Sequence, residues 1–161
     1  TNILLVEPVP YNYKILLNKF KDYKNISICT KAVFSKNQKK NFYYVKEASI
    51  PKLGKHWASG IGSFDKQHII NHKSKRFKIK DDDIDNIEID FITFENLVKI
   101  YEIRKIDTLQ IDVEGAEYEI LNSINFENIE IDSIQFESKH FDGTFTVGPK
   151  LNSIKEADHS P

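Results

Sequence analysis

The feature that most constrains this chain is a short apolar run that stops at a cluster of acidic residues. Thr108–Ile111 has the length and character of a buried parallel strand, and Asp112 follows it directly. Gly115 permits a tight turn, and residues 116–123 have the composition of a helix. We therefore predict a strand, a turn and a helix of an α/β sheet. In open sheets of this kind, ligands bind beyond the carboxyl ends of the strands.

Three carboxylates crowd the end of this strand, those of Asp112, Glu114 and Glu117. Such a group is costly to keep together unless it binds something, which makes it a candidate ligand site. The two glutamates have a second interpretation, because acidic residues also stabilise a helix N-terminus through its dipole. That interpretation explains Asp112 less well, since Asp112 lies at the tip of the strand itself.

A second acidic residue ends a strand near the start of the chain. The run Ile3–Val6 predicts a buried strand, and Glu7 and Pro8 separate it from a helix predicted over residues 11–23. In nucleotide-binding α/β folds, an acidic residue at this place accepts hydrogen bonds from both ribose hydroxyls. From the residues alone, a surface glutamate is the equal alternative. A strand predicted over residues 25–30 would follow in parallel, with a right-handed crossover.

The middle of the chain has less pattern. Beyond strands predicted at residues 41–45, 87–92 and 133–137, a helix is predicted from Thr93, as its cap, to about Ile103. For residues 46–80 we predict a loop around Gly60–Gly62. Three side chains from this stretch could line a substrate pocket, namely Ser63, His56 and His68. The acidic run at residues 81–86 lacks the glycine and glutamate of a calcium loop and is predicted to be a solvated turn.

Composition narrows the classes of function. With 23 Lys and Arg against 24 Asp and Glu, the chain has no strongly basic field, which argues against nucleic acid as a partner. No apolar run approaches the roughly 20 residues of a membrane span. The single Cys29 predicts a reducing, cytoplasmic setting. His68 and His72 have a metal-compatible spacing without a third ligand, so no metal site is predicted. Because the chain has no Met and opens inside an apolar run, we expect a fragment.

Several stretches resemble one known family. Residues 106–121 resemble the "iDxxxiDvEGaExxxL" signature of the FkbM family of S-adenosylmethionine-dependent methyltransferases. Residues 4–10 resemble its "fEPnP" stretch, residues 89–97 its "v.tLddl" element, and residues 134–137 its "i.iE" strand. The resemblance covers about residues 3–140.

The resemblance implies a Rossmann-like class I methyltransferase sheet in one partial domain over residues 1–161, with a loop or hairpin insertion around residues 36–90. The implied reaction moves a methyl group from S-adenosylmethionine to a hydroxyl of a sugar or another small-molecule or glycan acceptor. The family's glycine-rich strand and turn before the Glu-Pro strand are not found here, nor is its final hairpin. The sheet is therefore expected to be incomplete at the N-terminus, with a gap beside the central strand.

The resemblance also implies roles for single residues. Glu7 and Pro8 would bind the cofactor, Glu7 through its ribose, with the adenine near Ala32 and Val33 and the methionine moiety near Asp112. The acceptor side would be shaped by Glu114, Glu117 and Ser63. The candidate base that takes the acceptor proton is Asp112 or His140. A histidine suits this role because an imidazole titrates near neutral pH, and the alternative for His140 is an ordinary surface histidine. Two other functions stay open: a non-catalytic interaction module, and a nicotinamide-binding domain, which the missing G-x-G-x-x-G disfavours.

Overall fold

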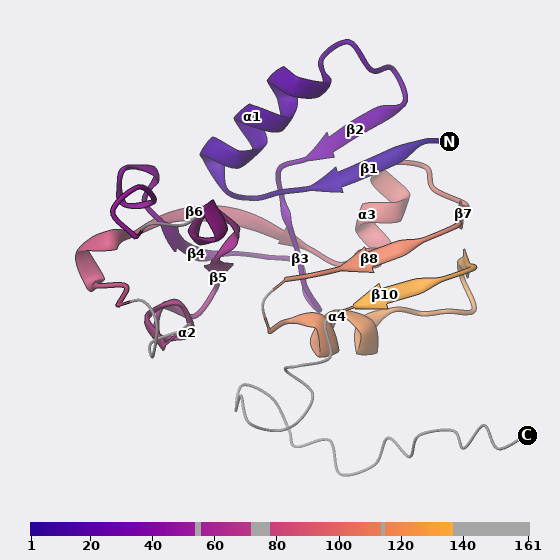
Figure 1. Ribbon diagram of the computed structural model, residues 1–161. Coiled ribbons are helices and arrows are strands. Elements are labelled where there is room, and N and C mark those ends of the chain that lie inside the picture. Colours follow the sequence, from indigo (N-terminus) through magenta and orange to yellow (C-terminus); the bar gives the residue numbers. More distant parts are fainter. Residues whose placement is uncertain (54–55, 72–77, 114, 137–161) are drawn as a thin grey trace, which may run out of the picture.

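We describe a computed structural model of the 161-residue chain (Figure 1). The structure describes residues 1–53, 56–71, 78–113 and 115–136. The strands are β1 (Ile3–Val6), β2 (Ile26–Cys29), β3 (Ala32–Val33), β4 (Gln38–Val45), β5 (Gly62–Ser63), β6 (Ile84–Ile92), β7 (Lys105–Ile106), β8 (Leu109–Ile111), β9 (Glu130–Ile131) and β10 (Ile134–Phe136). The helices are α1 (Pro10–Phe20), α2 (Lys66–Asn71), α3 (Phe94–Ile100) and α4 (Glu117–Ser123), with 3-10 turns η1 (Glu47–Ser49), η2 (His56–Gly60) and η3 (Asp81–Asp83).

The chain opens with the predicted strand–helix–strand unit. β1 and β2 are parallel along their whole length. α1 connects them and begins with Pro10, whose fixed φ suits the first position of a helix. The helix ends at Phe20, earlier than the predicted Tyr23. The prediction of two parallel strands joined through a helix is confirmed.

A mixed sheet with the order β3-β6-β4-β5 lies beside this unit. β4 and β6 form its long antiparallel ladder, which runs from Gln38 opposite Phe91 to Val45 opposite Ile84, while β3 runs parallel to β6. Alternate apolar side chains of the ladder face a buried cluster, as expected of strands with one covered face. The cluster consists of Val9, Ala32, Phe42, Tyr44 and Phe91.

The stretch around Gly60–Gly62, which was predicted to be a loop, contains regular structure. The described part of residues 46–80 contains η1, η2, β5 and α2, which pack around a core of their own. The buried residues of this core are Val45, Ala58, Ile61, Ile69, Ile79 and Ile84. At Gly62 an added Cβ would lie 2.5 Å from the ring carbon Cζ of Phe42, so the close approach of strand and ring requires glycine there. The prediction of a loop around Gly60–Gly62 is therefore wrong.

The acidic run also departs from its prediction, because Asp83 is 1% exposed. Its carboxylate accepts hydrogen bonds from the Ser49 hydroxyl at 2.9 Å and from the Lys80 backbone N–H at 3.0 Å, and it forms an ion pair with Lys52. Burial alone would raise the pKa of Asp83, but the hydrogen bonds from Lys52, Lys80 and Ser49 together lower it. Asp83 thus joins η1 to η3 instead of lying in a solvated turn.

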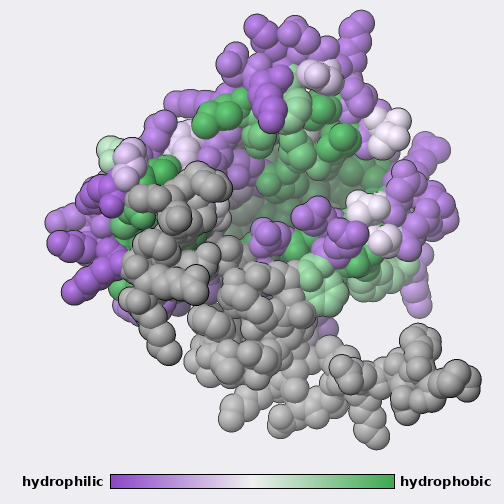
Figure 2. All heavy atoms as spheres, viewed as in Figure 1, coloured by the Kyte–Doolittle hydropathy of each residue, from purple (hydrophilic) through white to green (hydrophobic). Residues whose placement is uncertain are grey.

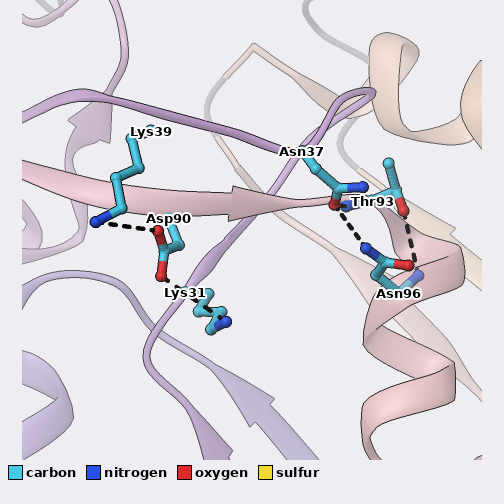
Figure 3. Close-up of polar contacts among 6 residues, drawn as sticks. All are labelled: Lys31, Asn37, Lys39, Asp90, Thr93 and Asn96. Carbon is cyan, nitrogen blue, oxygen red and sulfur yellow. Dashed lines mark hydrogen bonds and ion pairs between the residues drawn. The ribbon is translucent and has the colours of Figure 1, made fainter.

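The N-terminus of α3 is capped by two side chains (Figure 3). The Thr93 hydroxyl accepts a hydrogen bond from the Asn96 N–H at 3.2 Å, which confirms the predicted cap. The Oδ1 atom of Asn37, from the turn before β4, accepts the Thr93 N–H at 3.0 Å and the Asn96 side-chain amide at 2.9 Å. The helix ends at Ile100, before the predicted Ile103, because Glu102 adopts a left-handed φ of 53°.

An open cleft separates the two main parallel strand pairs. β1 pairs with β2, and β8 pairs with β10. In Figure 1 all four strands point the same way. Residues of both β1 and β8 line a cavity of about 1200 Å³. Phe94 and Leu97 of α3 contribute to its wall. Figure 2 shows apolar side chains gathered in this hollow and hydrophilic ones around it. Among the described residues, β8 pairs with β10 alone, and the gap expected beside it stays a prediction.

The remaining elements are short. β7 and β9 form a two-residue parallel ladder. Beside it, the Lys105 ammonium contacts Glu130 at 2.7 Å and Asp132 at 3.1 Å. In the part of the chain that the structure describes, none of the helices has the length and hydrophobicity that crossing a membrane requires.

Candidate functional site

The candidate site lies where β1 and β8 end on the same cavity. Glu7 follows the last residue of β1, and Asp112 follows the last residue of β8. Both line the cavity between the strands, and Asp112 is exposed. The structure therefore places two acidic residues that lie far apart in the sequence on the lining of one cavity. Their position is the carboxyl edge of two parallel strand pairs, which is where α/β sheets bind ligands.

Glu7 is held in one orientation by its neighbours. Its Oε1 atom accepts the Val9 backbone N–H at 2.8 Å, and its Oε2 atom accepts the Asn12 side-chain amide at 3.3 Å. Partial burial raises the pKa of Glu7, and the bonds from Val9 and Asn12 act in the opposite direction. Each carboxylate oxygen can accept more than one hydrogen bond, so both retain capacity for a ligand that offers two donors.

The wall beside Glu7 is apolar. Ala32 is buried and Val33 is half-buried, and both line the cavity together with Pro8. Phe34 follows β3 and packs against Phe64, with ring centroids 5.1 Å apart and ring planes at 57°. A flat apolar ligand group that entered here would contact β3 and these rings.

The turn after β8 is built around Glu117. This side chain is 0% exposed, and its two oxygens accept the backbone N–H groups of Val113 and Gly115, each at 2.9 Å. The peptide that links Asp112 to Val113 is thus held by Glu117. The carboxylate is turned into the protein, so it shapes the site through this turn. Glu114, the third acidic residue of the cluster, lies outside the described residues.

Gly115 packs closely against His68 of α2. Its φ of 111° is one that residues with a side chain rarely adopt. A Cβ atom there would lie 3.3 Å from the Cε1 atom of His68 in α2. His68 and Ser63 both line the cavity, and the Ser63 hydroxyl accepts the Asp65 N–H at 3.1 Å. The 46–80 segment thereby reaches the end of β8.

Other predicted features are placed less directly. His140, a candidate base, lies outside the described residues. Within the ranges that the structure describes, no group of three or more His, Cys, Asp or Glu side chains could hold a metal ion. Asn12 was missed by the sequence reasoning, although it is a polar residue on the first turn of the helix that follows Glu7. A polar side chain between Tyr11 and Tyr13, one helical turn after an acidic strand end, was the available signal.

The fold and the site define a class. One strand of each parallel pair, β1 and β8, is followed by an acidic residue that lines a shared cavity, and an apolar wall lies beside Glu7. This is the arrangement of an α/β protein that binds a small ligand at its strand ends. The family model described as the methyltransferase FkbM domain matches residues 1–158. The chain belongs to this family and is a methyltransferase, as its resemblance predicted. Searches among curated proteins and among solved structures found no match.

Proposed function

We propose that this chain is an S-adenosylmethionine-dependent O-methyltransferase with a Rossmann-like class I arrangement of its strands. The observation that carries the proposal is the placement of Glu7 and Asp112 at two strand ends on one cavity. The Glu7 carboxylate fits a ribose, because its two oxygens are oriented by Val9 and Asn12 and can each accept a further bond from a diol.

The other residues take their roles from this placement. Ala32 and Val33 offer an apolar surface for the adenine, and Pro8 shapes the turn beside it. Asp112 lies on the side of the methionine moiety. Bound S-adenosylmethionine supplies an activated methyl group on a positively charged sulfur.

The acceptor is a small molecule or glycan that carries a hydroxyl, and its site is formed by the turn after β8 and by Ser63. We assign Glu114 and Glu117 to the acceptor side, and Glu117 is the side chain that holds this turn. Asp112 or His140 takes the hydroxyl proton, a step worth roughly 10²–10⁴-fold in rate. Holding the acceptor oxygen in line with the methyl group contributes the rest.

Calorimetric titration with S-adenosylhomocysteine tests the proposal, because it needs no knowledge of the acceptor. We expect the chain to bind, and Glu7→Gln to weaken binding about tenfold or more, since bonds to a charged acceptor are worth about 1.5–3 kcal/mol. Glu95→Gln is the matched control, because Glu95 is exposed on α3. A folded chain that shows no binding, or a Glu7→Gln variant that binds equally well, would refute the cofactor assignment.

A further inference from the structure

Asn12 connects two parts of the site that are far apart in the sequence. It lies on the first turn of α1 and is half-buried. Its side-chain amide nitrogen donates to Oε2 of Glu7 at 3.3 Å and to the backbone carbonyl of Ser59, in η2, at 2.7 Å. The amide has two hydrogens, so these two bonds use both of them. One side chain thus links the end of β1 to the segment that precedes β5.

Neighbouring contacts make this link part of a packed junction. The Tyr11 hydroxyl donates to the Val45 carbonyl at 3.0 Å, and its ring meets Tyr44 edge-on at 6.0 Å. A Cγ2 atom of Val9 lies 3.6 Å from the Cβ position of Gly62. The turn between β1 and α1 therefore rests on the wall of the cavity that contains Gly62.

We propose that Asn12 is a positioning residue, which orients the Glu7 carboxylate for the cofactor ribose and couples cofactor binding to the 58–63 wall of the acceptor side. This inference rests on the proposed function. A ligand that fixes Glu7 also fixes the Asn12 amide, and the amide in turn fixes Ser59. Because such coupling is reciprocal, an ordered 58–63 segment also favours cofactor binding.

The chemistry requires an amide at this position. A carboxylate of the same shape would place a second negative charge beside Glu7 and would face the Ser59 carbonyl with an acceptor instead of a donor. Asn12→Asp therefore reverses both contacts with little change in volume. Asn12→Ala removes both contacts without adding charge, and it serves as a second variant if the aspartate variant does not fold. Asn18→Asp is the matched control, since Asn18 is exposed on the same helix.

Two measurements test the proposal, calorimetric titration with S-adenosylhomocysteine and hydrogen exchange of residues 58–63 with and without that ligand. In the unmodified chain we expect the ligand to slow exchange in this segment. In Asn12→Asp and Asn12→Ala we expect affinity to fall about tenfold, as for the loss of one bond to a charged group, and the slowing to disappear. The circular dichroism spectra of both Asn12 variants are expected to match that of the unmodified chain. The Asn18→Asp control is expected to keep both the affinity and the slowed exchange of the unmodified chain.

The outcomes separate this inference from the proposed function. If the unmodified chain does not bind S-adenosylhomocysteine, the cofactor assignment fails, and this inference fails with it. If the chain binds and Glu7→Gln loses affinity, but both Asn12 variants keep the affinity and the protection of residues 58–63, the coupling through Asn12 alone is refuted. A loss of affinity with unchanged protection would also overturn the coupling.

Discussion

The hydrogen bonds in the turn after β8 allow us to predict how much stability the Glu117 side chain contributes. The Glu117 side chain is fully buried and receives the backbone N–H groups of Val113 and Gly115, each at 2.9 Å. In Glu117→Gln, one carboxylate oxygen becomes an NH₂ group that faces one of these N–H donors. The variant keeps the shape of the side chain, so the change is confined to charge and hydrogen bonding.

The expected cost follows from the bonds that are lost. A hydrogen bond to a charged group contributes about 1.5–3 kcal/mol, and a buried donor left without its acceptor costs about 1–3 kcal/mol. The amide partly offsets this, because it no longer buries a charge. We expect the free energy of unfolding to fall by about 2–4 kcal/mol and Tm to fall by about 5–15 °C for a chain of this size.

Urea unfolding followed by far-ultraviolet circular dichroism measures the change. Glu119→Gln is the matched control, because Glu119 lies in the same first turn of α4 but is partly exposed. Both variants lose one negative charge near the helix N-terminus, so their difference isolates the bonds to the turn. An unfolding free energy of Glu117→Gln within about 0.5 kcal/mol of the control would refute the reasoning.

Two further predictions concern stability. Asp83→Asn replaces one of the two buried oxygens that accept from the Ser49 hydroxyl and the Lys80 N–H, and it should cost about 1–3 kcal/mol in urea unfolding. The pKa of Asp83 is lowered in the folded chain, so the stability that its carboxylate contributes is present above its unfolded pKa and is lost as the pH falls through the folded pKa. The difference in unfolding free energy between the unmodified chain and Asp83→Asn should therefore shrink in acid. A difference that does not change with pH would contradict this. Asn37→Ala removes the acceptor of Thr93 and Asn96 and should cost about 1 kcal/mol, measured in the same way, with no change contradicting the capping role.

Elements whose limits are set by neighbouring residues could be predicted from the sequence. Ile3–Val6 is uniformly apolar and bounded by Glu7 and Pro8, and the structure has a strand with those limits. Thr93 precedes an apolar stripe and caps α3 as predicted. Glu7 and Asp112 could be found in the same way, because a predicted strand that is followed by an acidic residue can be identified from the sequence alone.

What the sequence did not predict depends on contacts between distant residues. Ile61 and Ile69 are buried against Val45, but they follow neither a helical nor an alternating period. Asp83 is buried within an acidic run because Ser49 and Lys52 reach it from another segment. No local pattern distinguishes it from its exposed neighbours.

The same limit applies to the candidate site. The role of Glu117 depends on a turn whose backbone N–H groups converge on it, and that of Asn12 on a carbonyl 47 residues away. Helix dipole reasoning gave Glu117 a place near a helix N-terminus but could not show that its carboxylate turns inward. Geometry of this kind becomes visible only when the chain is folded.

The cleft between β1 and β8 has a consequence for how the protein behaves in solution. Ile3 and Glu7 direct their N–H groups to the carbonyls of Asn25 and Cys29 beside β2, so the alternating residues Leu4 and Val6 direct theirs into the cleft. The Leu109 N–H donates to the Ser133 carbonyl beside β10. By the same alternation, the backbone N–H of Gln110 faces the cleft from the other side.

Two rows of backbone donors and acceptors with the same strand direction thus face each other across the cleft. Rows of this kind are a template for pairing with another extended segment. An extended segment that entered the cleft would meet one of these edges. In solution, these two edges of the described residues are therefore where pairing with a further extended segment is expected.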